Sequence, residues 1–239
     1  MDRLTRRELK QDQLRTTYEG FEEFAKTHYK DILGVVGVAV VVVGLAAALK
    51  FYMDRQEAEA NAQLGAALKT FRAYVGNASP EVVGADSPSF PTAQEKYKKA
   101  LQQFTEVVHK FPRQNAAAIA RYHVGVCQAA LGDQAAAIKT LEEASRASDR
   151  NIASLSQFAL AGVYASAGKL AEAGKLYQKL ADHPTLTVPK ASALLAWADA
   201  ERGDKPAHSR QIYEQLQKEF GSDVALAGVI KEQLAELPK

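Results

Sequence analysis

The residues able to do acid–base or metal chemistry are few and scattered along this 239-residue sequence. No two histidines are four residues apart, and a single cysteine cannot supply the paired thiolates of a zinc site. Their spacing predicts no catalytic residues, no metal site and no cofactor, so the chain is not expected to be an enzyme. The six residues are His28, His109, His123, His183, His208 and Cys127.

Other kinds of chemistry also lack a pattern. The glycines Gly34, Gly37 and Gly44 lie inside an apolar run, so they do not form a phosphate-binding loop. The net charge of +2 comes from an even mixture of charges without a basic face, which predicts no nucleic-acid partner. A small-molecule substrate is not expected either. Cys127 lies in an apolar helical pattern and is predicted to be a buried packing residue.

The longest element is an apolar run over 32–49, followed by Phe51 and Tyr52, which predicts a transmembrane helix over 32–53. A soluble core helix would have a polar face, which this run lacks. A cleaved signal peptide is the remaining alternative, but about thirty residues precede the run, whereas a signal sequence has a short basic start. A retained anchor is therefore the favoured interpretation.

The charges around this run predict its orientation. Residues 1–31 carry seven basic and seven acidic side chains, and fewer basic residues follow the run directly. The positive-inside rule then predicts a cytoplasmic N-terminus, with the remainder of the chain on the other side of the membrane. Within 1–31, apolar residues recur every three or four positions, which predicts an amphipathic helix that lies on the membrane, binds a partner or is simply solvated.

Small residues recur along one face of the predicted transmembrane helix: Gly34, Gly37, Gly44 and Ala48. Because apolar area alone does not drive helix pairing in lipid, a face of small residues favours close packing against another helix. Glycine is common in membrane spans, so plain anchoring is the alternative.

The chain after the anchor is rich in alanine and repeats. A helix, a Gly-centred turn and a second helix recur, and the turn glycines Gly132, Gly168 and Gly203 are separated by 36 and 35 residues. These glycines suit the left-handed conformation that closes a helix, and Asp133 and Asp204 are placed to cap the helix that follows. The pattern predicts an all-α stack of about four helix pairs over 54–221.

The segments "SQFALAGVYASAGKLAEAGKLYQKL" and its neighbours resemble tetratricopeptide repeats, through the small residue, tyrosine, glycine and alanine at Ala161, Tyr164, Gly168 and Ala173. The last copy has His208 or Ser209 where a small alanine is usual. A Gly-, Pro- and Ser-rich loop over 76–91 interrupts the first copy, and a capping helix is expected over 222–239.

Such stacks bind peptides on the surface lined by their first helices. The residues expected there are apolar and aromatic, which predicts a groove for unfolded or partner segments; the alternative is that Phe158 and Trp197 pack under the capping helix. The four candidates are Tyr122, Val126, Phe158 and Trp197.

The layout as a whole is similar to the ancillary subunit of the bacterial Sec translocon. That resemblance implies a single-pass protein of the bacterial inner membrane with a periplasmic repeat domain. It further implies a translocon or periplasmic chaperone component that binds protein partners and unfolded clients, although residues 1–31 are longer than is usual there. Two other classes remain open: a scaffold that coordinates cell-envelope assembly or cell division, and a membrane-anchored adaptor whose repeats stay in the cytoplasm.

Overall fold

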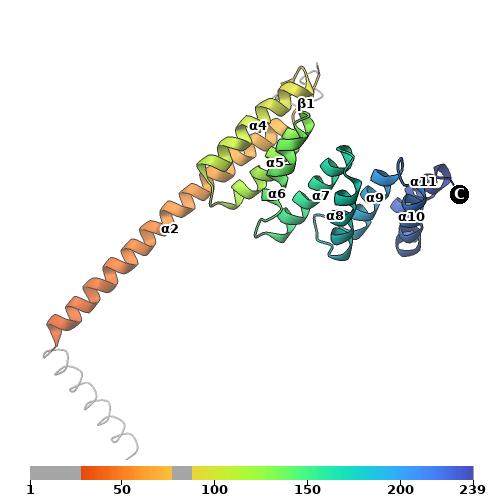
Figure 1. Ribbon diagram of the computed structural model, residues 1–239. Coiled ribbons are helices and arrows are strands. Elements are labelled where there is room, and N and C mark those ends of the chain that lie inside the picture. Colours follow the sequence, from red (N-terminus) through yellow and green to blue (C-terminus); the bar gives the residue numbers. More distant parts are fainter. Residues whose placement is uncertain (1–27, 77–87, 239) are drawn as a thin grey trace, which may run out of the picture. The chain divides into compact units, whose positions relative to one another are not determined.

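A computed structural model describes residues 28–76 and 88–238 (Figure 1). These residues are mostly helical, which confirms the all-α prediction. The chain divides into two compact units, Met1–Arg55 and Gln56–Lys239. Residues 1–27 of the predicted amphipathic segment 1–31 and most of the predicted loop 76–91 lie outside the described residues.

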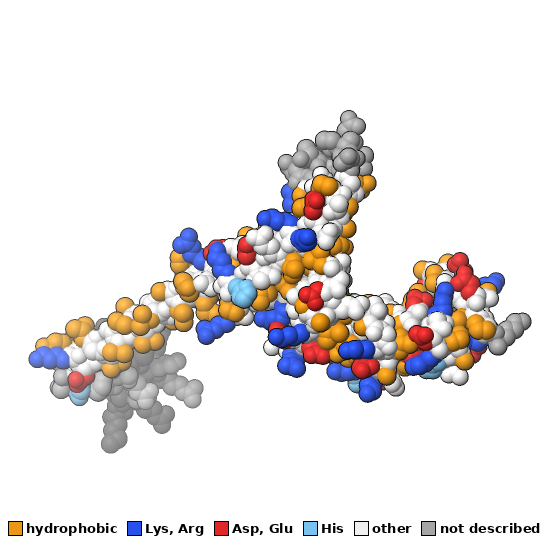
Figure 2. Space-filling view, turned by 45° about the horizontal axis from the view of Figure 1, so that its top comes forward, with side chains coloured by type: hydrophobic (Ala, Val, Ile, Leu, Met, Phe, Trp, Pro, Cys, Tyr) orange, Lys and Arg blue, Asp and Glu red, His pale blue; other side chains and the backbone are white. Residues whose placement is uncertain are grey.

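Helix α2 (Tyr29–Phe71) is 43 residues long and contains the apolar run. The part within the first unit is long and apolar enough to cross a membrane, and none of its most apolar window is buried by protein. Its valines and leucines are exposed, as the hydrophobic surface in Figure 2 shows. The last turns of α2 belong to the second unit, where Ala60, Leu64 and Ala67 enter a hydrophobic core.

The second unit is a stack in which each helix packs on the next. In addition, α5 contacts α7 and α7 contacts α9, so these three alternate helices form a continuous row. The helices are α4 (Ala93–Lys110), α5 (Asn115–Ala130), α6 (Gln134–Ala144), α7 (Arg150–Ser166), α8 (Leu170–Asp182), α9 (Lys190–Glu201), α10 (Pro206–Phe220) and α11 (Val224–Glu236).

The second helix of each pair repeats one packing unit. A small buried residue is followed four positions later by a large buried one, so both lie on the same helix face. The small residue allows close approach of a neighbouring helix, and the large residue fills the layer between pairs. The small residues, with spacings of 37, 36 and 36, are Ala100, Ala137, Ala173 and Ser209. Their large partners at the same spacings are Phe104, Leu141, Tyr177 and Tyr213.

The fourth copy keeps this unit with serine in place of alanine. Ser209 is fully buried, and its hydroxyl donates a hydrogen bond of 2.8 Å to the carbonyl oxygen of Ala198 on α9. The partner satisfies the buried hydroxyl. Ser209, and not the half-buried His208, is therefore the small residue of the last pair.

The turns between paired helices are not all alike. Gly132 and Gly168 have φ values of 86° and 74°, which confirms the predicted left-handed closure, and Asp133 accepts a hydrogen bond from the Ala136 amide. The predictions for Gly203 and Asp204 are wrong. The α9–α10 turn holds one residue more than the other two, so α10 begins at Pro206 with Lys205 at its N-cap and no side-chain cap.

Two short strands, β1 (Tyr74–Val75) and β2 (Ser89–Phe90), pair in parallel with Tyr74 opposite Ser89. The sequence did not predict them. At the other end, the expected last helix is present as α11, whose N-cap Asp223 accepts hydrogen bonds from the amides of Ala225 and Leu226. It starts two residues later than the predicted segment 222–239.

Candidate functional site

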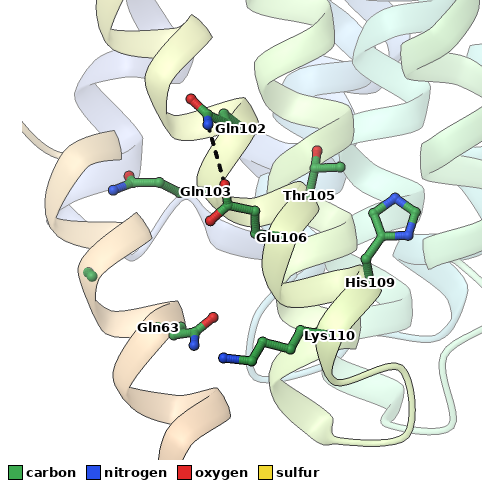
Figure 3. A pocket seen from close by; sticks show the side chains of 8 residues that line it. Gln63, Gln102, Gln103, Thr105, Glu106, His109 and Lys110 are labelled. Atoms are coloured by element: carbon green, nitrogen blue, oxygen red, sulfur yellow. Dashed lines mark hydrogen bonds between the residues drawn. The ribbon is translucent and has the colours of Figure 1, made fainter.

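A groove of about 770 Å³ lies between the end of α2 and helix α4 (Figure 3). It lies wholly within the second unit. The residues that line it are mostly polar in type, although the surface that they expose to the groove is mainly that of their apolar stems: Gln63, Ala66, Gln102, Gln103, Thr105, Glu106, His109 and Lys110. The groove thus offers hydrogen-bonding groups along two helices.

Helical spacing places the α4 side chains on this face. Gln102 and Glu106 are four residues apart, and the Gln102 amide donates a hydrogen bond of 3.3 Å to the Glu106 carboxylate. Across the groove, Lys110 forms an ion pair with Glu59 of α2. Gln63 and Lys110 point toward one another from opposite walls (Figure 3).

These groups are suited to binding another polypeptide. Amide and carboxylate side chains can pair with backbone or side-chain groups of a docked helix. The Thr105 hydroxyl is engaged, because it donates a hydrogen bond of 2.7 Å to the Leu101 carbonyl oxygen. The sequence did not predict this groove. Its only signal was the pair of adjacent glutamines Gln102 and Gln103, and the distance between α4 and α2 depends on the tertiary structure.

The predicted aromatic groove residues on α5 and α7 lie in two neighbouring layers. Tyr122 is half-buried against the cluster that contains Leu141 and Leu160. Phe158 lies one layer further along, with its ring centroid 5.8 Å from that of Tyr177. Val126 is half-buried on α5. Phe158 and Trp197 share a cluster, whereas Tyr122 does not belong to it.

Trp197 is half-buried between α8 and α10. Its indole nitrogen lies so close to Gly174 that a Cβ added there would be 3.2 Å away, and its ring centroid is 5.3 Å from that of His208. The residue occupies the position held by Val124 on α5 and Leu160 on α7, one residue before a buried small residue. Alignment on the turn glycines Gly168 and Gly203, which are 35 residues apart, would instead place Trp197 opposite Gly162, two positions from Leu160.

A buried carboxylate beside Trp197 was not predicted. The Glu201 side chain is 3% exposed and makes an ion pair of 3.2 Å with Lys205 and a contact with Nδ1 of His208. Burial raises the pKa of Glu201, but the hydrogen bonds from His208 and its other neighbours outweigh burial, so the pKa is lowered overall. This cluster ties the end of α9 to α10 through a charge that is almost fully removed from water.

A second polar group shielded from water is the half-buried His123 of α5. The imidazole of His123 stacks on Phe104 with a centroid distance of 4.7 Å and meets Phe71 edge-on at 4.9 Å. Its Nδ1 is buried and has no hydrogen-bond partner among the residues that the structure describes. Burial, with a smaller effect from the positive charge of Arg72, lowers the pKa of His123 to about 4. Burial likewise raises the pKa of Cys127 to about 12, so this thiol is not a nucleophile at neutral pH.

The small residues of the apolar helix lie on an open surface. A Cβ added at Gly34, Gly37 or Gly44 would meet nothing within 4 Å, and Ala48 is exposed. In residues 28–76 and 88–238, no group of three or more His, Cys, Asp or Glu side chains could hold a metal ion.

No family model, no curated protein and no solved structure matches this chain.

Proposed function

We propose that this protein is a membrane-anchored protein–protein interaction module. The observation that carries the proposal is the combination, in one chain, of an exposed apolar helix and a stack of paired helices. The apolar stretch of 18 residues is long and apolar enough to cross a membrane, and no described part of the chain covers it. A stack of paired helices presents an extended surface whose usual use is binding other polypeptides.

The helix pairs are proposed to be tetratricopeptide-like repeats. Support comes from the helix–turn–helix order, the glycine closures after α5 and α7, and the small and large buried residues that recur every 36 or 37 residues. The small residues Ala137 and Ala173 lie where that repeat has its alanine, and Ser209 replaces alanine in the last pair.

The proposed setting is the inner membrane of a bacterium, with the N-terminus in the cytoplasm and the stack in the periplasm. The basic residues that precede the apolar run favour this orientation. In this setting the module acts as an accessory component of the Sec translocon or of the periplasmic chaperone network and binds client or partner polypeptides. Its proposed partners are proteins; no cofactor, nucleic acid or small-molecule substrate forms part of the proposal.

The groove between α2 and α4 favours a second candidate, a scaffold for cell-envelope assembly or cell division. Its walls carry the polar groups of Gln63, Glu106 and Lys110 beside apolar surface, and such a mixture is typical of contacts between folded proteins. The half-buried aromatic residues Tyr122 and Phe158 favour the client-binding alternative.

Site-specific photocrosslinking in cells separates the two candidates. A photoreactive residue at Val126 should capture translocon subunits and unfolded exported chains if the first proposal holds, whereas one at Gln102 should capture assembly or division proteins if the second holds. Lys139, exposed on α6, is the control position. Identical capture at all three positions would contradict both proposals.

Two further measurements test the binding surface and the orientation. Trp197 is the only tryptophan of the chain, so its fluorescence reports directly on peptides that bind near it. Peptide affinity that is unchanged in Trp197→Ala and Phe158→Ala would refute an aromatic groove. A reporter fused after Lys239 should be active only in the periplasm, and cytoplasmic activity would place the repeats inside the cell.

The membrane face is tested by changing Gly37 and Gly44 together to leucine. We expect loss of a complex that depends on helix packing within the membrane, because two added side chains separate the helix backbones. An intact complex would mean that the helix only anchors the protein.

A further inference from the structure

A tyrosine of α8 reaches the row formed by α5, α7 and α9. Tyr177 is 4% exposed, and its ring meets that of Phe158 edge-on with the centroids 5.8 Å apart. Its hydroxyl oxygen lies 3.8 Å from the place that a Cβ would take at Gly162 of α7. Phe158 and Gly162 are four residues apart and share the face of α7 that is predicted to bind peptides. The Tyr177 hydroxyl therefore reaches this face at the point where glycine has no side chain.

This hydroxyl has no partner. It makes no hydrogen bond with any residue of the described ranges, although the rest of the Tyr177 side chain is buried. It is not one of the fully buried unpartnered polar atoms of that part of the chain, so solvent reaches it. Burial and the nearby negative charge of Asp199 raise the pKa of Tyr177 to about 12. The hydroxyl thus keeps its proton at neutral pH and is a free hydrogen-bond donor.

The next helix pair has the corresponding tyrosine, and there the hydroxyl is engaged. Tyr213 of α10 follows Tyr177 at the repeat spacing, and its hydroxyl donates a hydrogen bond to Oδ1 of Asp199 on α9. Asp199 stands directly after a buried alanine of α9, as Gly162 does on α7. A carboxylate therefore satisfies the second tyrosine, whereas glycine at the same position leaves the first one free.

The surroundings of the free hydroxyl favour an uncharged ligand group. Residues 151–168 carry no charged side chain, so α7 is neutral after its first residue. Leu155 and Phe158 are half-buried on the same face as Gly162 and are apolar. The carboxylate of Asp199 disfavours a second anion near the hydroxyl. A neutral hydrogen-bond acceptor flanked by apolar side chains fits these groups.

An extended polypeptide supplies such an acceptor. Its backbone carbonyls are free, whereas those inside a helix are already bonded to amides four residues further on. The side chains of an extended segment alternate between two faces, so every second one can lie against Leu155 and Phe158.

We propose that the Tyr177 hydroxyl, open at Gly162, donates a hydrogen bond to a backbone carbonyl of an extended, apolar client segment that lies across α7. The inference rests on the proposed client-binding function and specifies the state in which the client is bound. Tyr177 is then a specificity-determining residue, because it selects a segment whose backbone is not yet folded.

Equilibrium binding of a short peptide to the full-length protein in lipid nanodiscs tests this assignment. The probe is a fluorescent peptide of leucine, valine and alanine with a lysine at each end, and empty nanodiscs correct for its binding to lipid. Tyr177→Phe keeps the ring against Phe158 and removes only the hydroxyl, so we expect binding about 3- to 10-fold weaker. Tyr213→Phe, which removes a hydroxyl already bonded to Asp199, is the matched control and should bind within about twofold of the unchanged protein. Equal affinities of Tyr177→Phe and the unchanged protein would overturn the proposal.

Closing the opening at Gly162 is an independent arm. Val126 holds the corresponding position on α5, and a Cβ at Gly162 makes only an ordinary contact at 3.8 Å, so Gly162→Val suits the stack and covers the hydroxyl. The affinity should fall to that of Tyr177→Phe, and the two substitutions together should lower it no further. A full additional loss in the double variant would refute contact through this opening. Circular dichroism confirms that each variant is folded.

A helical form of the same peptide, locked by side-chain bridges, tests the extended conformation. Its carbonyls are bonded internally, so Tyr177→Phe should leave its affinity unchanged. A loss equal to that seen with the flexible peptide would overturn the extended conformation. If the unchanged protein bound neither peptide, the proposed client function would fall together with this inference. Binding that does not depend on Tyr177 would contradict this inference alone.

Discussion

We expect His123 to make the stability of the second unit, Gln56–Lys239, sensitive to mild acid. In the folded protein burial holds the imidazole neutral with a pKa of about 4, while in the unfolded chain the pKa is near its ordinary value of 6.5. Between these two values the unfolded chain binds more protons than the folded one. Stability is therefore complete above pH 6.5 and is lost progressively as the pH falls toward 4.

The size of the effect follows from the two pKa values. Between pH 7.5 and pH 5 the shift alone corresponds to a loss of about 2 kcal/mol of unfolding free energy. The ring is half-buried, so screening by solvent reduces the expected loss to about 1 to 2 kcal/mol. Carboxylates with lowered pKa values, such as Glu201, lose their contribution only below about pH 4.5 and do not disturb this window.

The assay is denaturant unfolding of the full-length protein in detergent, followed by helical circular dichroism at pH 7.5 and pH 5. His123→Phe keeps the ring contacts with Phe71 and Phe104 but cannot take up a proton, so most of the difference between the two pH values should disappear. His109→Gln, at an exposed histidine of α4, is the control and should keep the full difference. The same pH dependence in His123→Phe and the unchanged protein would refute the reasoning.

Two substitutions test the packing within the stack. Gly125→Ala forces a Cβ against Leu141 and should lower the unfolding free energy by about 1 to 3 kcal/mol. The control Gly65→Ala, on an open helix face, should raise it by about 0.5 to 1 kcal/mol. Equal effects of the two substitutions in denaturant unfolding would contradict the close contact at Gly125. Glu201→Ala leaves Lys205 and His208 without the buried carboxylate and should lower the unfolding free energy by about 2 to 4 kcal/mol. Glu219→Ala, at a more exposed ion pair, should lower it by less than about 1 kcal/mol. Similar thermal midpoints for these two variants would show that the buried cluster is not stabilising.

The sequence was sufficient to predict the elements that follow a period. The turns at Gly132 and Gly168 and the buried positions Ala137 and Ala173 were predicted, because helix closure and small-residue packing depend on local residue types. The apolar helix was predicted for the same reason, since hydrophobicity over 18 residues is a local property.

What the sequence did not predict depends on the register between helices or on distances across the fold. The place of Trp197 depends on where α9 ends: Ala198 lies three residues before the last residue of α9, whereas Ala161 lies five before the end of α7, and no pattern in α9 indicates this difference. The aromatic surroundings of His123 and the groove at Gln102 bring together residues from helices far apart in the sequence. Glu201 had the pattern of an exposed charge, and only packing against α8 and α10 buries it.

The unequal turns also bear on how this chain can change over evolutionary time. Ala173 and Ser209 keep a spacing of 36 residues although the turn before α10 is longer and α9, with 12 residues, is shorter than α7, with 17. The five residues by which α9 is shorter are made up by one more residue in the turn before α10, two more in the α8–α9 connection and two more in α8 than in α6. The positions that hold the stack together are thereby preserved. Single-residue insertions and deletions can therefore accumulate in the turns and first helices while the second helices stay in step, and divergent copies should be aligned on the second helices.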